Sequence, residues 1–156
     1  MLARDIMTRE VVMIPVGMPV EDLIDTLRDK KITGAPVVDS EDNLVGIVSN
    51  EDIIHSQLYA ERRETSDSGL MDIFKSGFTS VTPGGDRPDK PGLVAEIMTR
   101  NVITVNEDSS LAEICTILIE RKIHRLPVTS GGRLVGIIST LDIVKAVSNG
   151  VLVEKQ

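Results

Sequence analysis

The sequence contains very few aromatic residues: no tryptophan, one tyrosine and two phenylalanines among 156 residues. The hydrophobic core must therefore be aliphatic, and the 41% of hydrophobic residues is enough to form one. A single cysteine, Cys115, excludes an intrachain disulfide and fits a reducing compartment. No apolar run approaches the roughly 20 residues of a membrane span. The N-terminus also lacks a signal-peptide pattern, so a cytoplasmic location is expected.

Charge and the scarcity of histidine exclude further classes of function. A formal net charge of −7 disfavours phosphate-backbone binding as the main role. His55 and His124 are the only histidines, too few and too badly spaced for a zinc site. Cys115 lies on an apolar helical stripe, which favours a core position over a nucleophilic one. Because no catalytic arrangement stands out, we expect that the protein is not an enzyme.

What the sequence does contain is an internal repeat. The stretch LVGIVSNEDII at Leu44–Ile54 returns as LVGIISTLDIV at Leu134–Val144. DIMTREVVMI returns as EIMTRNVITV, and KITGAPVV returns as KIHRLPVT, in the same order. One supersecondary unit used twice explains this pattern. We therefore predict a first unit over residues 1–61, a linker over 62–91 and a second unit over 92–156. The linker is rich in turn formers and contains one short apolar island, LMDIF.

Each unit predicts the element order strand, helix, strand, strand, helix. Apolar residues recur with helical spacing over 19–30 and again from residue 111, and helices over 50–61 and 140–148 follow the Ser-x-x-Asp motifs. APVV and NLVGIVS, like LPVT and RLVGIIS, predict strand pairs that are antiparallel across tight turns. Neither unit can bury its aliphatic sheet face alone. The predicted fold class is therefore α+β, with two β-α-β-β-α units whose sheets pack together.

The Ser-x-x-Asp motif in both units has two interpretations. The serine can cap the following helix, and the acid can hydrogen-bond back to it, as in a capping box. Alternatively, the helix N-terminus can attract an anion while the carboxylate accepts hydrogen bonds from two vicinal hydroxyl groups. The two interpretations are compatible, and the pattern alone does not choose between them.

The ordered set of IMT-x-x-V, KIHRLPV and Gly-aliphatic-aliphatic-Ser-x-x-Asp resembles the CBS domain. This domain is named for cystathionine β-synthase and occurs as tandem pairs called Bateman modules. The resemblance covers nearly the whole chain except the linker. It implies two units related by a pseudo-twofold axis, with two equivalent clefts between them. In that family the clefts bind AMP, ADP or ATP, and less often S-adenosylmethionine or NAD.

The resemblance assigns ribose binding to the aspartate of each motif and places residues of the other unit opposite it. One cleft would contain Asp142, Ser139, Ile137, Ile32, Thr33, Ala35, Val16 and Gly17. The other would contain Asp52, Ser49, Ile47, Ile123, His124, Arg125 and Leu126, with Asn106 and Glu107 nearby. Ile47 and Ile137 would flank adenine, since aliphatic side chains can enclose a flat base.

Phosphate contacts would come from His124 and Arg125, because a guanidinium offers paired, always-charged donors. The first unit has Thr33 and Gly34 at these positions. The two clefts are therefore chemically unequal, and we expect one of them to dominate.

Three hypotheses of function remain. The first is a stand-alone regulatory module that binds an adenosine-containing ligand, with no obligatory cofactor, and signals to a separate partner protein. The second is an assembly module with vestigial clefts, which the Thr33-Gly34 departure keeps open. The third is a nucleic-acid-binding protein, which the acidic balance disfavours, so neither a nucleic-acid nor a membrane partner is expected. Family analogy adds a homodimer through the helices. Ile53, Ile54, Ile143 and Val144 fit either such contacts or core packing.

Overall fold

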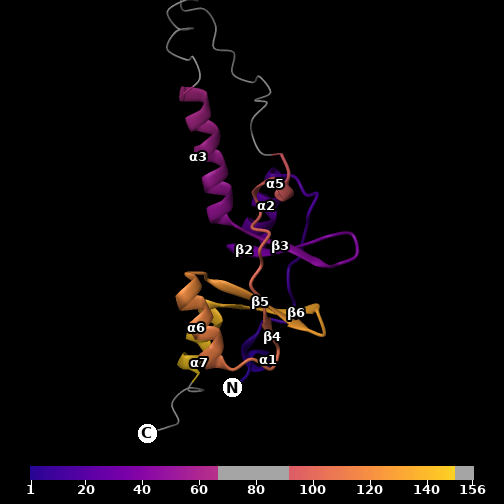
Figure 1. Cartoon of the computed structure of the whole chain (residues 1–156), viewed down its shortest axis with the longest axis vertical. Coiled ribbons are helices and arrows are strands. Elements are labelled where there is room, and N and C mark those ends of the chain that lie inside the picture. The colour runs from indigo at the N-terminus through magenta and orange to yellow at the C-terminus, as the bar shows by residue number, and fades with distance from the viewer. Residues whose placement is uncertain (67–91, 150–156) are drawn as a thin grey trace, which may run out of the picture.

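The computed structural model describes residues 1–66 and 92–149, with side chains considered for 1–58 and 92–149. The predicted LMDIF island and nearly all of the predicted linker lie outside these residues. Within them, the structure confirms the α+β class and the β-α-β-β-α order of both units. The first unit lies in the upper half of Figure 1 and the second in the lower half.

The two units have matching elements. The first consists of β1 (Ile14–Pro15), α2 (Val20–Lys30), β2 (Gly34–Val38), β3 (Leu44–Ser49) and α3 (Asn50–Ser66). The second consists of β4 (Val105–Asn106), α6 (Leu111–Arg121), β5 (Arg125–Ser130), β6 (Arg133–Ser139) and α7 (Thr140–Ser148). In each three-stranded sheet the first strand is parallel to the second, and the second is antiparallel to the third. Compared with the predicted helix over 50–61, α3 continues to Ser66.

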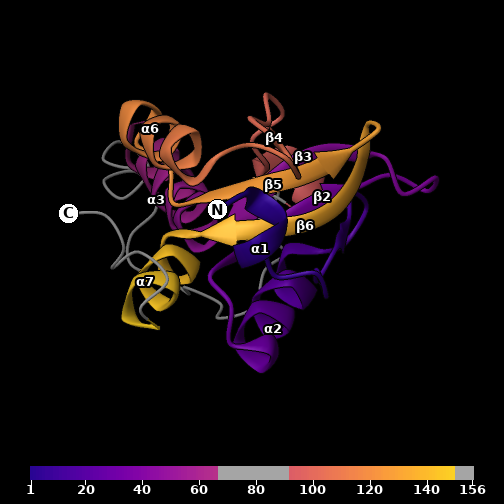
Figure 2. The ribbon, with the colours of Figure 1, turned by 90° about the horizontal axis from the view of Figure 1, so that it is seen from below.

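Local sequence explains where these elements begin and end. Ser110 caps α6 by accepting a hydrogen bond from the Glu113 backbone amide at 3.2 Å. The β5–β6 turn uses Gly131 and Gly132, both with positive φ, as a tight turn matched to the twist of the strands requires. Figure 2 shows the strands of both sheets at the centre of the molecule, with α2, α6 and α7 around them.

A short helix precedes each unit and packs on the other unit. The helix α1 (Ala3–Ile6) lies beside the second unit, and α5 (Val94–Ile97) lies beside the first (Figure 1). Backbone hydrogen bonds fix both in place: the Ala3 amide donates to the Ser109 carbonyl oxygen at 2.8 Å, and the Val94 amide donates to that of Met18 at 2.9 Å. The two leading segments are therefore exchanged between the units.

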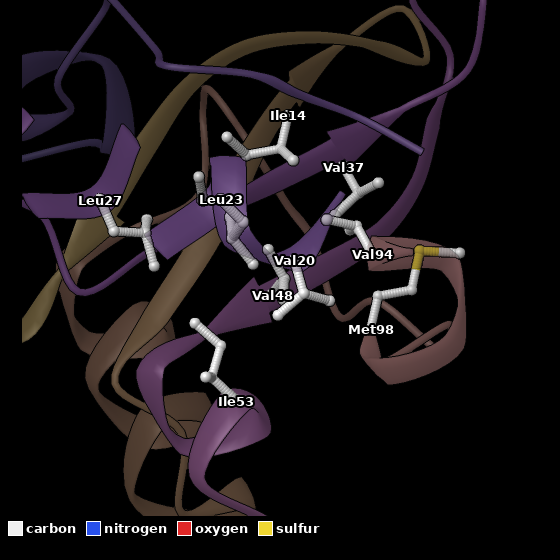
Figure 3. Packing of buried hydrophobic residues seen from close by; sticks show 10 residues of the cluster. Ile14, Val20, Leu23, Leu27, Val37, Val48, Ile53, Val94 and Met98 are labelled. Atoms are coloured by element: carbon white, nitrogen blue, oxygen red, sulfur yellow. The ribbon is translucent and has the colours of Figure 1, made fainter. Parts of the chain in front are cut away.

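The exchange completes two hydrophobic cores. Val94 and Met98 pack into the first core with Val20, Val37 and Val48, as Figure 3 shows. The second core receives Ala3 and Met7 in the same way. Each methionine covers a glycine of the sheet beneath it: Met98 lies over Gly46, and Met7 lies over Gly136. A side chain at either glycine would occupy the space of the methionine.

None of the helices within residues 1–66 and 92–149 is long and apolar enough to cross a membrane.

Candidate functional site

A cavity of about 490 Å³ lies between the two units, beside the start of α3. The first unit contributes the end of β3 and the first residues of α3. The second contributes the segment after the exchanged helix α5 and the residues leading into β5. The lining residues are Thr33, Ile47, Val48, Ser49, Asn50, Glu51, Asp52, Thr99, Asn101, Val102, Ile103, Lys122, Ile123, His124 and Arg125.

Asp52 is held at the N-terminus of α3 by hydrogen bonds of the kind that its Ser-x-x-Asp motif predicts. Its Oδ2 accepts from the Ser49 amide at 2.7 Å and from the Ser49 hydroxyl at 3.0 Å. The Thr33 carbonyl oxygen accepts from the Asn50 amide at 3.0 Å, which ties this helix start to the entrance of β2. The carboxylate is therefore held at the cavity wall, beside the backbone amides that a helix N-terminus leaves available for an anion.

Arg125 provides the opposite charge. Its Nη2 donates to the Thr33 hydroxyl at 2.7 Å, across the boundary between the units. Its Nη1 is buried and has no hydrogen-bond partner among the residues that the structure describes. Burial lowers the pKa of the guanidinium, while the nearby carboxylates of Glu51 and Asp52 raise it. Nη1 is packed against the first unit, but Arg125 as a residue lines the cavity, where its positive charge can attract an anionic ligand.

Most residues predicted for the Asp52 cleft line this cavity. They are Asp52, Ser49, Ile47, Ile123, His124 and Arg125. Leu126 does not, because successive side chains of β5 point to opposite faces and Leu126 is fully buried in the second core. Asn106 and Glu107 do not line it either: Asn106 accepts from the Asp108 amide, and Glu107 accepts from the Ser130 hydroxyl.

The prediction omitted Thr99, which belongs to the second IMTR segment, and three residues just after that segment, Asn101, Val102 and Ile103. They reach the cavity because Thr99 and Ile47 exchange backbone hydrogen bonds, at 2.9 and 3.0 Å. The recurrence of IMTR in both units was the available signal. It does not reveal that this segment pairs with the other unit.

The first-unit residues predicted for the Asp142 cleft lie in several different surroundings. Thr33 lines the Asp52 cavity, because Arg125 reaches across to it. Ala35 is buried in the first core for the same reason of strand alternation as Leu126. Val16 and Ile32 pack against that core, and Gly17 lies in the turn before α2.

The start of α7 repeats the capping arrangement around Asp142. Its Oδ2 accepts from the Ser139 amide at 2.8 Å and from the Ser139 hydroxyl at 2.6 Å. Ile137 exchanges backbone hydrogen bonds with Thr8, as Ile47 does with Thr99. One difference is electrostatic: Lys145 Nζ lies 3.9 Å from Asp142 Oδ1, and α3 has His55 at the corresponding position.

Among residues 1–66 and 92–149, no group of three or more His, Cys, Asp or Glu side chains is arranged to hold a metal ion.

Comparison with known proteins gives a consistent assignment. A family model described as CBS domain matches residues 3–59 and 94–149. An uncharacterized protein of Methanocaldococcus jannaschii is 30% identical over 166 residues, covering 94% of this chain and 90% of the relative. The chain spans about half the length of three other curated relatives, with shares between 41% and 55%.

Two solved structures extend the comparison. The crystal structure of CBSX2 in complex with AMP is 25% identical, with a TM-score of 0.70, and the match covers 96% of this chain and 98% of that one. The CBS domain pair of protein MJ0100, in complex with 5-methylthioadenosine and S-adenosyl-L-methionine, has a TM-score of 0.69 at 22% identity. That match covers 96% of this chain and 98% of that one, and at this identity it supports the fold.

Proposed function

Because the chain belongs to the CBS domain family and carries a tandem pair of these domains, we propose that it is a regulatory module for an adenosine-containing ligand. The proposed ligand is AMP, ADP or ATP, bound in the cleft at Asp52, and the response is passed to a separate partner protein. S-adenosylmethionine and NAD are weaker candidates. No catalytic step is part of this proposal.

The observation that carries the proposal is the arrangement of charge and apolar surface in one cavity. Asp52 can accept from ribose hydroxyls on one side, while the guanidinium of Arg125 can donate to phosphate. Ile47, Val102 and Ile123 offer aliphatic surface for a base. A volume of about 490 Å³ falls in the range of roughly 300–1,000 Å³ common for small-molecule sites. The AMP complex of CBSX2 gives the ligand class a precedent among similar proteins.

Two differences favour the Asp52 cleft over the Asp142 cleft. Arg125 and His124 line the cavity at Asp52, whereas the first unit has Gly34 and Thr33 at these positions. The Asp142 carboxylate also faces Lys145, which competes for an oxygen that a ribose would need. We therefore expect a single dominant site, filled by a phosphate-bearing ligand.

The proposal includes a homodimer formed through α3 and α7 and a cytoplasmic location. Of the four aliphatic residues named for the second helices, Ile53 is buried and Ile143 packs against a core. Ile54 and Val144 are instead 54% and 56% exposed. These two, with Leu58, Leu141 and Val147, leave apolar surface available on both helices.

Titration calorimetry with AMP, ADP, ATP, NAD and S-adenosylmethionine tests the ligand proposal, using Asp52→Asn and Asp142→Asn as a matched pair. Both substitutions affect the same kind of helix cap, so they should change stability similarly. Only Asp52→Asn should weaken the dominant binding event, by about tenfold or more, because it removes a charged acceptor.

Equal weakening by both variants would contradict the choice of cleft. The absence of binding at millimolar concentrations to the folded wild-type protein would contradict a sensor altogether. It would favour the assembly module with vestigial clefts.

A further inference from the structure

Arg125 lies in a space that the first unit leaves open at Gly34. A Cβ atom at Gly34 would fall on Nη1 of Arg125, 2.6 Å from its Cζ and 2.7 Å from the Val48 carbonyl oxygen. Any side chain at position 34 would therefore displace the guanidinium. Thr33, the residue just before it, accepts from Nη2 at 2.7 Å. Thr33 and Gly34 of the first unit thus form a binding position, here called the seat, for the Arg125 side chain of the second unit.

The matching position of the second unit carries a full side chain. Gly34 pairs with Ser49 across its sheet, and Arg125 pairs with Ser139 in the same register of the other sheet. At Gly34, however, two neighbours leave no room for a Cβ atom: the guanidinium from the other unit and the Val48 carbonyl oxygen.

The backbone around the seat is anchored equally in both units. The Thr33 carbonyl oxygen accepts from the Asn50 amide, and the His124 carbonyl oxygen accepts from the Thr140 amide, both at 3.0 Å. The Thr33 hydroxyl consequently has a fixed position relative to the start of α3 and to Asp52. A guanidinium is planar, so one hydrogen bond at Nη2 also restricts the direction of its other donors.

We propose that Thr33 and Gly34 position the Arg125 guanidinium for a phosphate group bound in the Asp52 cleft, so that both units build one phosphate site. Thr33 and Gly34 act as positioning residues, and Arg125 makes the contact. The inference rests on the proposed function. It also gives the Thr33-Gly34 departure a role: the first unit has no cation at this position and instead holds that of the second.

The test compares affinity for AMP with affinity for adenosine, which lacks the phosphate. The ratio of the two affinities isolates phosphate recognition from any general change in the cleft or in stability. Thr33→Val removes the acceptor at similar volume, and we expect it to lower the ratio about tenfold. Thr33→Ser keeps a hydroxyl and should restore most of the ratio. Thr26→Val is the matched control, because its hydroxyl bonds within α2, to the Asp22 carbonyl oxygen.

A double-mutant cycle shows whether Thr33 acts through Arg125. In an Arg125→Gln background the ratio should already be low, and Thr33→Val should lower it little further. Gly34→Ala should lower the ratio in the wild-type background and much less in the Arg125→Gln background. These results would support the positioning role.

An unchanged or raised ratio in Thr33→Val would overturn the inference while leaving nucleotide binding intact. An equal loss with and without Arg125 would overturn it as well. If the wild-type protein binds neither AMP nor adenosine, the proposed function fails first, and this inference fails with it.

Discussion

Asp52 and Asp142 hold the starts of α3 and α7, and in the proposed function Asp52 also binds the ligand. Both carboxylates accept from the amide and the hydroxyl of the serine three residues earlier. The capping role could be predicted from Ser-x-x-Asp alone, because it depends only on local spacing. The difference between the two sites could not, because it arises from Arg125 on another element and from Lys145 one turn along α7.

At this scale we expect Ser139→Ala to destabilise the ligand-free protein by about 1 kcal/mol, through loss of the α7 cap. The Ser139 hydroxyl both donates to Asp142 Oδ2 and accepts from the Asp142 amide, so the substitution removes two hydrogen bonds. Urea unfolding measures the change. Ser109→Ala is the control, because the hydrogen bonds of Ser109 are made by its backbone. Equal stability of the two variants would show that the cap contributes nothing.

Among the secondary-structure elements, the exchanged helices α1 and α5 depend most on packing against the other unit. Each leading helix is four residues long, too short to be stable by itself, and is held by the unit it packs on. Asp5 and Glu96 close these turns by accepting from the backbone amides of Leu2 and Leu93, each at 2.8 Å. The methionine that follows each helix then enters the core of the other unit.

Met98→Ala should therefore destabilise the first unit, although Met98 belongs to the second repeat in the sequence. We expect a loss of about 2–5 kcal/mol, as for other buried methionines, because the space over Gly46 is left unfilled. Hydrogen exchange should show reduced protection in β2 and β3. Met13→Ala is the control, since Met13 is exposed. Loss of protection confined to β5 and β6 would contradict the exchange.

The sequence predicted the helices and strands of each unit but not the exchange of their leading segments, for a physical reason. Helical and strand periodicity is local, so α2, α6 and both hairpins follow from residues close together in the chain. Both repeats carry the same IMTR segment, however, and a segment that fits one sheet fits the other. Nothing in the pattern distinguishes packing within a unit from packing between units. For that reason Thr99 and Ile103 were absent from the predicted site.

At the scale of the whole molecule, the aliphatic surface of α3 and α7 remains to be explained. Leu141, Val144 and Val147 recur at helical spacing along α7 and are all exposed. Their spacing places them along one side of the helix, while Ala146 is buried and Ile143 packs against the second core. Such a stripe is consistent with a second copy of the chain packing against it.

We expect Val144→Glu to convert the proposed homodimer to a monomer without lowering the stability of the monomer fold. A charged carboxylate buried in an apolar interface would be unpaired, whereas on an exposed helix it costs little. Sedimentation velocity measures the change in mass. Ile119→Glu is the matched control, because Ile119 is exposed on a different helix, α6. A dimer unaffected by Val144→Glu would place the interface elsewhere.

The exchange of leading segments also bears on how two repeats in one chain can come to differ. In this chain each repeat fills its core with the leading segment of the other, and two identical repeats could fill both cores by the same exchange. The described parts of this chain therefore hold, in one polypeptide, what separate copies would form as a swapped pair. Once both copies are covalently joined, they no longer have to remain identical. One can keep the arginine, and the other can become the place where that arginine rests.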